Sequence, residues 1–355
     1  MNPFTAFSAA EQVAEHLRAE LLRGSFSGTM PGVNPLAAEL GVNHKTVKAA
    51  LKMLENEGLL VNQGRGVQRC IALPDDHTPP ALWVAVLSFD MGARGEQFMI
   101  ELCHLLEKAG HTPFFTDKTL AELGRSVRQV SRFVKKTEAD AWVVCGGSQE
   151  ILEWFAQQET PAFALFGARD GLPIAGTGPD KTQPLAEATR RLIGLGHHRI
   201  SFLCRHEIRL PQPSRGVRAV LDEIEAAGFV TGAFNLPNWE ESPEGFERCL
   251  DSLFGPTPPT ALILDEPFLF NAGFHYLAKR GLRVPQDVSL VCTDSDLGFD
   301  WCDPTVAHIR WDYRPVVRRI QRWANNVARG KDDRRQSLTK AEFVEGGTAG
   351  PVRGD

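Results

Sequence analysis

Apolar residues recur with helical spacing near the start of the chain. Val13, Leu17 and Leu21 stand at positions i, i+4 and i+8, which places them on one face of a helix. Ser8 and Glu11 precede this stripe with the spacing of a capping box, in which each side chain bonds the other residue's backbone N–H. The pattern therefore predicts a first helix that begins after Ser8.

Two further helices are predicted between this helix and residue 58. Gly24 ends the first helix as a left-handed cap. Asn34 is expected to cap the second helix, with Pro35 at its first position, and Gly41 closes it. Asn43 caps the third helix. The apolar stripe of that helix, at i, i+3, i+4 and i+7, comprises Val47, Ala50, Leu51 and Leu54.

A short hairpin follows the third helix. Two apolar segments, 59–61 and 67–71, flank a glycine-rich tip that carries Arg65. Three helices followed by a hairpin are the order of a winged helix-turn-helix. We expect this domain to occupy residues 1–73, and the polar, proline-rich residues 74–80 to form a linker.

Apolar strand patterns then alternate with helical patterns. Strands are expected at residues 82–89, 112–116, 141–145, 162–166, 200–204, 261–264 and 289–293. Helices are expected at residues 96–110, 127–134, 181–195, 216–227 and up to Gly281. This alternation indicates parallel sheets covered on both faces. Residues 81–355 are too many for one core, so the fold class is α/β with two lobes behind the winged helix.

Charge and cysteine content narrow the function classes. Residues 1–73 carry seven Lys and Arg against six Asp and Glu, whereas the remaining chain carries 32 against 38. Contact with nucleic acid would therefore be local rather than spread over the chain. The seven cysteines show neither CxxC pairs nor zinc-ligand spacing, as expected of free thiols in a reducing cytoplasm. We find no secretory leader and no apolar run of membrane-spanning length, and so expect a cytoplasmic protein without membrane contact.

The third predicted helix has the chemistry of a DNA reader. Lys45, Lys48 and Lys52 accompany His44, and no acid lies between residues 43 and 52. A helix N-terminus attracts phosphate, and first-turn side chains can reach base edges in the major groove. Arg65 between two glycines can approach the backbone or the minor groove. Three lysines on a lone helix could be only a solvated face, but capping, spacing and hairpin together favour DNA binding.

Residues 1–73 resemble the GntR family of winged helix-turn-helix regulators. The resemblance is carried by residues 36–42, 43–51, 54–59 and the tip at 63–66. The family usually has a basic residue at the position of Asn34 and arginine at that of His44. The resemblance implies contact with double-stranded operator DNA by Asn34, Asn43, His44, Lys45, Thr46, Lys48, Gln63, Gly64, Arg65 and Gly66.

Residues 81–355 resemble the effector domain of LacI/GalR regulators, which is similar to type I periplasmic binding proteins. The motifs are residues 84–90, 195–200, 281–291 and 346–348, in the family's order. The resemblance implies two lobes, three chain crossovers and a small-molecule cleft between the lobes. The usual arginine before residue 216 is replaced by Pro213, with Arg215 nearby, and the usual Asn-Asp pair is Asp265-Glu266.

Several polar and aromatic residues follow the predicted strands. Ligands of α/β sheets bind at the carboxyl ends of strands, where acids and arginines can pair with hydroxyl groups. Alternatively, each acid could be a helix cap, and each aromatic could belong to the core. The ligand-site candidates are Asp90, Phe89, Arg205, Arg215, Asp265, Phe268 and Asp294.

Together these features predict a ligand-responsive, homodimeric transcription regulator, most simply a repressor with a sugar-like effector. A constitutive DNA-binding dimer that has lost its ligand is a second hypothesis. An enzyme of carbohydrate metabolism with a regulatory head is a third, although GxSxG, Walker and HExxH motifs are absent. We expect neither cofactor nor metal. The histidine pair at residues 197–198 has no third metal ligand at useful spacing. The Asp-Ser-Asp segment at residues 294–296 is too short for a calcium site.

Overall fold

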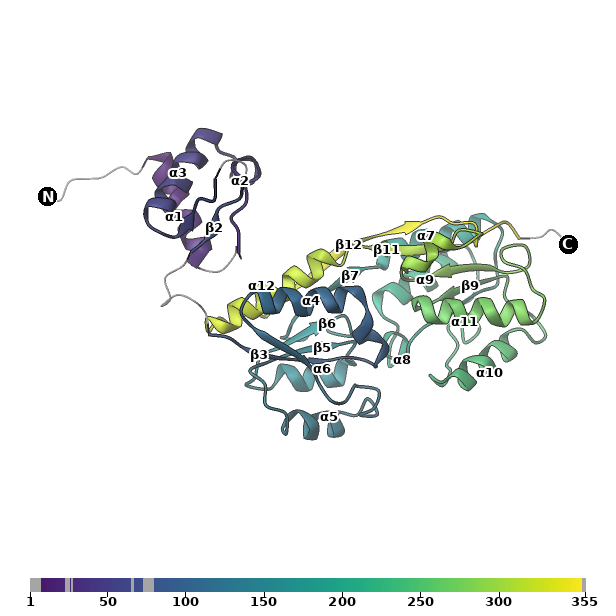
Figure 1. The fold of residues 1–355 in the computed structure, drawn as a ribbon. Coiled ribbons are helices and arrows are strands. Elements are labelled where there is room, and N and C mark those ends of the chain that lie inside the picture. The colour runs from purple at the N-terminus through teal and green to yellow at the C-terminus, as the bar shows by residue number, and fades with distance from the viewer. Residues whose placement is uncertain (1–7, 23–25, 27, 65–66, 73–79, 353–355) are drawn as a thin grey trace.

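The computed structural model describes residues 8–22, 26, 28–64, 67–72 and 80–352. The N-terminal domain contains α1 (Ala9–Leu22), α2 (Val33–Leu40), α3 (His44–Asn56), β1 (Leu60–Val61) and β2 (Cys70–Ile71) (Figure 1). The two strands pair in antiparallel register, and the apolar faces of all three helices enclose one small core. The predicted winged helix-turn-helix is confirmed.

Local capping explains where these helices begin. Ser8 and Glu11 form the predicted capping box, with Ser8 N donating to Glu11 Oε2 over 2.6 Å. Asn43 caps α3 by accepting a hydrogen bond from Lys45 N over 2.9 Å. Gly41 ends α2 in the left-handed conformation, at φ +64°.

The predicted cap at Asn34 is wrong. Gly32 is the cap of α2, and its carbonyl already accepts a hydrogen bond from Leu36 N. Asn34 therefore lies inside the first turn, and Pro35 after it. Proline is tolerated there because the first N–H groups of a helix have no partner within it. The Gly24 end of the first helix lies outside the described residues.

The body is an α/β structure. Its strands are β3 (Trp83–Leu87), β4 (Thr112–Phe115), β5 (Ala141–Cys145), β6 (Ala162–Leu165), β7 (Ala175–Asp180), β8 (Ile200–Leu203), β9 (Ala261–Leu264), β10 (Ser289–Cys292), β11 (Ala307–Trp311) and β12 (Gln336–Val344). Its helices are α4 (Gln97–Lys108), α5 (Val127–Val134), α6 (Gln149–Ala156), α7 (Thr182–Gly194), α8 (His206–Arg209), α9 (Arg215–Ala226), α10 (Pro243–Leu253), α11 (Glu266–Lys279) and α12 (Arg314–Ala328). Short 3₁₀ turns cover Gly92–Gly95 and Leu297–Trp301.

One continuous sheet connects two lobes. The strand order is β4-β3-β5-β6-β7-β12-β11-β10-β9-β8, parallel throughout except where β12 meets β11. The N-terminal lobe contains β3–β7 with α4–α6 and α12, and the C-terminal lobe contains β8–β11 with α7–α11 (Figure 1). The long strand β12 belongs to both, because it pairs with β7 at its start and with β11 at its end.

The chain passes between the lobes three times, as the sequence resemblance implied. It leaves the N-terminal lobe after β7, returns through β11 to α12, and crosses again along β12. Helix α12 belongs to the N-terminal lobe because its fully buried Trp323 packs on Phe163 of β6, at 5.3 Å between ring centroids. The carboxyl ends of β7 and β11 therefore adjoin the contact between the lobes.

The Gly-Gly-Thr motif at residues 346–348 has a structural role. The Oγ1 of Thr348 donates to Leu290 O and accepts from Ala307 N, which joins the chain's end to two strands. Gly346 lies against the backbone of Val306, where an added Cβ would approach the carbonyl carbon to 2.3 Å.

We expect Gly346→Ala to destabilise the body by about 2 kcal/mol or more, because the neighbouring backbone cannot yield as a side chain could. Thermal unfolding of the full chain measures the loss. Gly194→Ala is the matched control, since nothing lies within 4 Å of its added Cβ. An unchanged transition in Gly346→Ala would contradict this packing.

Candidate functional site

Helix α3 buries one face and exposes another. Val47, Ala50, Leu51 and Leu54 are buried in the domain core. On other faces, Lys45, Lys48 and His44 are exposed and Thr46 is partly exposed. Lys52 differs from the other two lysines because its Nζ pairs with Glu55 Oε2 at 3.0 Å. Lys45 and Lys48 are thus the cations of α3 whose position suits phosphate contact.

The wing is tied directly to α3. Arg69 Nε lies 2.5 Å from Glu55 Oε1, and the hydrogen bond from Arg69 holds the pKa of the Glu55 carboxyl below its usual value. At the tip, Gly64 N donates to Asn62 Oδ1, and Gly64 adopts φ +115°, which favours glycine. Gln63 and Gly64 are exposed beside this turn, as is Asn34 on α2. Arg65 and Gly66 lie outside the described residues.

Arg205 is the centre of the contact between the lobes. It follows β8, and its guanidinium pairs with both carboxylate oxygens of Glu266, at 2.6 and 2.5 Å. Its Nη2 also lies 3.4 Å from Asp90 Oδ2, which belongs to the N-terminal lobe. The guanidinium stacks over Phe89 at 4.0 Å and lies 5.3 Å from the ring of Phe268. Four of the predicted ligand residues therefore lie together.

Asp294 joins the end of β10 to two crossover segments. Its Oδ2 lies 2.8 Å from Lys181 Nζ, just after β7, and its Oδ1 accepts a hydrogen bond from Trp311 Nε1 over 2.7 Å. Burial opposes the charge of Lys181, but the carboxylates of Asp294 and Asp265 raise the pKa of its ammonium. A movement of one lobe against the other must therefore change the contacts that Asp294 makes with Lys181 and Trp311.

Asp265 is placed at the N-cap position of α11 but does not cap it. Its Oδ1 accepts from Thr293 Oγ1 over 2.6 Å, and its Oδ2 accepts from Arg205 N over 3.3 Å. The side chain therefore organises the ends of β8 and β10. The alternative that this acid is an ordinary helix cap is wrong.

Arg215 lies apart from the Arg205 cluster. Its guanidinium is largely exposed and lies 3.0 Å from Asp170 of the N-terminal lobe. No bond to Arg205 or Asp294 is formed by this residue within the described chain, so its role in ligand binding stays a prediction.

Sequence reasoning missed several residues of this region. Lys181 was not singled out, and Glu266 was named only as part of the pair that replaces the usual Asn-Asp, although each pairs with a predicted residue. Three aromatic rings, Phe98, Phe166 and Trp311, lie within 5.6–6.2 Å of one another and adjoin Asp294 through the Trp311 indole.

A second ion-paired group crosses the lobes at Arg125. Its guanidinium lies over Phe89 at 4.9 Å, and it pairs with Glu207 at 3.3 Å and with Glu241. Glu207 and Glu241 both belong to the C-terminal lobe. This group extends the inter-lobe contact beyond Arg205 and shares one aromatic ring with it.

Backbone strain gathers at the same contact. The described non-glycine residues with positive φ are Arg125, Phe166 and Glu266, at +52°, +60° and +64°. Each such conformation costs about 1–3 kcal/mol and is typical of functional sites and switch regions.

Burial raises the pKa of the Glu266 carboxyl to about 7, against the lowering effect of Arg205. We therefore define the inter-lobe group as Phe89, Asp90, Phe98, Phe166, Lys181, Arg205, Asp265, Glu266, Phe268, Asp294 and Trp311.

Among the described residues, none of the helices has the length and apolar run that a bilayer crossing requires. His197 is buried and its Nε2 bonds Gly350 O at 2.9 Å, which gives it a structural partner.

Comparison with known proteins agrees with this architecture. Residues 9–68 match the bacterial regulatory proteins of the gntR family, and residues 189–349 match the periplasmic binding protein-like domain. The HTH-type transcriptional regulator DegA of Bacillus subtilis (strain 168) is 23% identical over 197 residues. That match covers 54% of this chain and 56% of DegA, so it spans about half of either protein.

Solved structures of LacI-type regulators share the fold. A putative transcriptional regulator LacI from Bacillus cereus subsp. cytotoxis NVH 391-98 superposes with a TM-score of 0.63 at 17% identity, over 76% of this chain and 98% of its own. The complex of the transcriptional regulator CelR with cellobiose superposes with a TM-score of 0.61 at 15% identity, over 90% of this chain and 100% of its own. The chain therefore joins a GntR-type winged helix-turn-helix to a LacI-like, periplasmic-binding-protein-like domain of two lobes.

Proposed function

We propose that this protein is a cytoplasmic transcription regulator that binds operator DNA through α3 and the wing, and a small polar effector between its lobes. The observation that carries the proposal is the inter-lobe group. Side chains from both lobes converge there in ion pairs and ring stacks, although they come from strand ends far apart in the sequence. A sugar-like effector is supported by the structural similarity to a regulator bound to cellobiose.

Regulation follows from the position of this group. An effector alters DNA affinity only if it binds one arrangement of the lobes better than another. A ligand hydroxyl that replaces the Arg205–Asp90 contact or the Lys181–Asp294 pair would change the balance between arrangements. A coupling of about 1–3 kcal/mol changes operator affinity about 5–150-fold. Repression is the outcome that we propose, with the effector releasing the operator.

Two measurements test the proposal. Selection of duplexes from a random pool by the full chain should yield one enriched, two-fold symmetric sequence. A carbohydrate library screened by thermal shift should then yield a compound that stabilises the protein and alters its affinity for that duplex. Failure to enrich any sequence would reject the DNA-binding function. A ligand that is chemically converted would favour the enzyme hypothesis, and operator binding without any response would favour the constitutive dimer.

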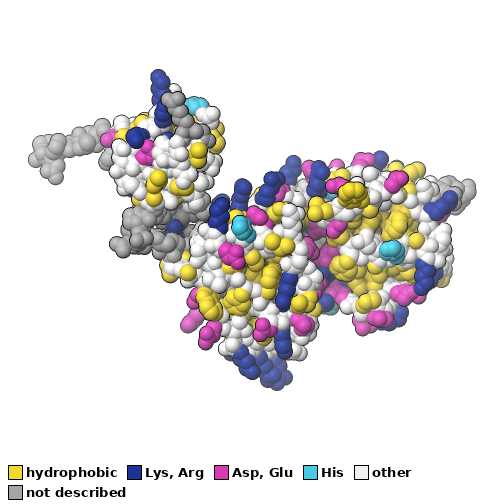
Figure 2. Space-filling view, in the orientation of Figure 1, with side chains coloured by type: hydrophobic (Ala, Val, Ile, Leu, Met, Phe, Trp, Pro, Cys, Tyr) yellow, Lys and Arg dark blue, Asp and Glu magenta, His cyan; other side chains and the backbone are white. Residues whose placement is uncertain are grey.

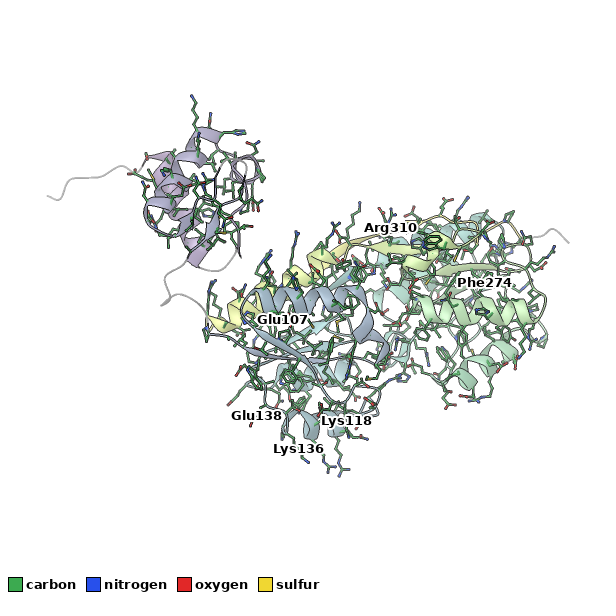
Figure 3. All side chains as sticks on the ribbon, viewed as in Figure 1. Glu107, Lys118, Lys136, Glu138, Phe274 and Arg310 are labelled. Carbon is green, nitrogen blue, oxygen red and sulfur yellow. The ribbon has the colours of Figure 1, made fainter. Side chains whose placement is uncertain are left out.

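We also propose a homodimer that reads a pseudo-palindrome, because one recognition helix covers few base pairs and two-fold symmetry doubles the contact. Exposed apolar side chains on α4 and α11 are candidates for its interface. Ile100 is 61% exposed and Phe274 is 37% exposed. Figure 3 shows Phe274 on α11, on the face of the body that also presents α4.

Ile100→Glu combined with Phe274→Glu is expected to convert the dimer to a monomer at micromolar concentration and to weaken operator binding at least about tenfold. Sedimentation velocity and a binding titration measure the two effects. Trp301→Glu is the control, since Trp301 is 91% exposed but belongs to neither helix. A wild-type protein that sediments only as a monomer, with and without DNA, would refute the dimer.

A further inference from the structure

Positive charge is concentrated on α12 and the turn that follows it, although the chain as a whole is acidic. Residues 314–335 contain eight Lys and Arg against two Asp, whereas the net charge of the whole chain is −5. Helix α12 itself contains four arginines and no acid. Figure 2 shows Lys and Arg side chains in a row along this edge of the body. A local excess of this kind favours a negatively charged partner.

Four of these cations are exposed and have no partner within the described chain. Arg318 and Arg322 stand four residues apart on α12, which places them on one face and about 6 Å apart along the axis. Lys331 and Arg335 follow in the turn after the helix. Among the described residues, the side chains of these four form neither an ion pair nor a hydrogen bond. We call them the α12 cations.

The acids beside the α12 cations are paired with other arginines. Asp312 pairs with Arg314, Asp332 with Arg334, and Asp333 with Arg319. The hydrogen bond from Arg314 lowers the pKa of the Asp312 carboxyl, and the charge of Arg318 lowers it further. These acids therefore leave the α12 cations without an ion-pair partner of their own.

The neighbouring helix does not neutralise them either. Helix α4 packs against α12, but its acids Glu101 and Glu107 form no ion pair with α12 within the part of the chain that is described. Burial lowers the pKa of the Arg319 guanidinium, and the like charges of Arg335 and Arg322 lower it further. Cations from the helix and from the turn thus act on the same group, so they form one surface.

The end of α12 lies where the N-terminal domain joins the body. Leu82, just before β3, donates its N–H to His111 Nδ1 over 3.3 Å, and the Nε2 of that ring lies 3.0 Å from Asn325 Oδ1 of α12. Figure 1 likewise shows the end of α12 beside the start of β3. The seven residues 73–79 can span at most about 25 Å. A duplex held by α3 and the wing is therefore tethered to the end of the body at which the α12 cations lie.

We propose that the α12 cations form a second DNA contact, which binds phosphates of the duplex beside the half-site that α3 reads. The inference rests on the proposed DNA-binding function and extends it from the winged helix to the body. An acidic protein surface has the same charge, but nothing in the chain holds one near α12, whereas the linker keeps DNA close and raises its effective concentration there. Phosphate contacts carry no sequence information but fix the orientation of a protein on the duplex.

Two matched double variants test the contact. Arg318→Gln with Arg322→Gln removes two α12 cations. Arg128→Gln with Arg132→Gln removes two exposed arginines, also four residues apart, from α5 on the opposite face of the sheet. In titrations of the full chain near physiological salt, the first pair should weaken operator binding at least about tenfold and lower the slope of log K against log salt concentration by about 1.8, since each phosphate contact contributes about 0.9. The α5 pair should stay within about twofold of wild type, with an unchanged slope.

A charge-preserving pair and a second duplex complete the test. Arg318→Lys with Arg322→Lys should stay within about threefold of wild type, because lysine also binds phosphate as a point charge. A random-sequence duplex should show the same loss of slope in the glutamine pair, so the contact is measured even if no operator is enriched and the proposed function fails. Equal losses in the α12 and α5 glutamine pairs would overturn the inference. Unchanged binding and slope in the α12 pair would also overturn it, and would favour an acidic protein as the partner of this surface.

Discussion

Replacing Lys45, Lys48 and Arg65 together by alanine is expected to weaken operator binding at least about 100-fold near physiological salt. Phosphate contacts supply most of the non-specific affinity for DNA, and each neutralised phosphate adds about 0.9 to the slope of log K against log salt concentration. Loss of three such contacts should lower that slope by about 2.7. The two lysines are exposed on α3 opposite its buried stripe, so the domain should keep its fold.

A control that removes equal charge separates this effect from general electrostatics. Lys118, Lys136 and Arg310 are exposed on the body and are labelled in Figure 3. Among the residues that the structure describes, their triple alanine variant breaks one exposed ion pair, between Arg310 and Glu342, which contributes little to stability. Its operator affinity should stay within about twofold of wild type. Binding and salt slope unchanged in the α3 variant would remove the basis for α3 as the recognition helix.

The positions that the sequence predicted well were those with a local physical cause. Asn43 caps α3 because its side chain reaches a free N–H two residues ahead. The strand at residues 261–264 was predicted with the bounds that it has, since four buried apolar residues in a row suit a strand covered on both faces. The predicted cap at Asn34 was wrong because Gly32 holds the cap position, and a glycine cap makes no side-chain hydrogen bond that a sequence pattern could reveal.

Elements whose form depends on distant neighbours were not predicted. Strand β7 reads Ala-Gly-Thr-Gly-Pro-Asp, which favours a turn, but it is held between β6 and β12. Glycine at residue 176 is needed there because an added Cβ would lie 2.4 Å from Arg169 Cδ. Strand β12 joins the two lobes, a role that depends on pairing with strands far away in the sequence.

The candidate ligand site was only half visible in the sequence. Asp90, Arg205 and Asp265 follow apolar strands, and this position at strand ends is a local signal. Lys181 stands at the start of a predicted helix and belongs to no motif, so its place at the site depends on how the lobes meet. The pairing of Arg205 with Glu266 could not be predicted either, since positive φ at Glu266 is a property of the folded chain.

Replacing Asp294 by alanine is expected to abolish the effector response while leaving operator binding without effector within about twofold of wild type. The carboxylate fixes Lys181 and the Trp311 indole at the ends of two crossover segments, so its loss removes both a ligand acceptor and the link between crossovers. The proposed DNA-binding surface is on α3 and the wing, in a domain with its own core. The two defects should therefore be separable.

The measurement is a pair of operator titrations, with and without a saturating effector found by thermal shift. Wild type should show a change of about 5–150-fold, and Asp294→Ala should show less than about twofold. Glu138→Ala, which removes an exposed acid from the N-terminal lobe (Figure 3), should respond as wild type does. A normal response in Asp294→Ala would place the effector elsewhere. If the variant loses operator binding but still unfolds cooperatively near the wild-type temperature, effector response and DNA binding are not assigned to separate domains as proposed.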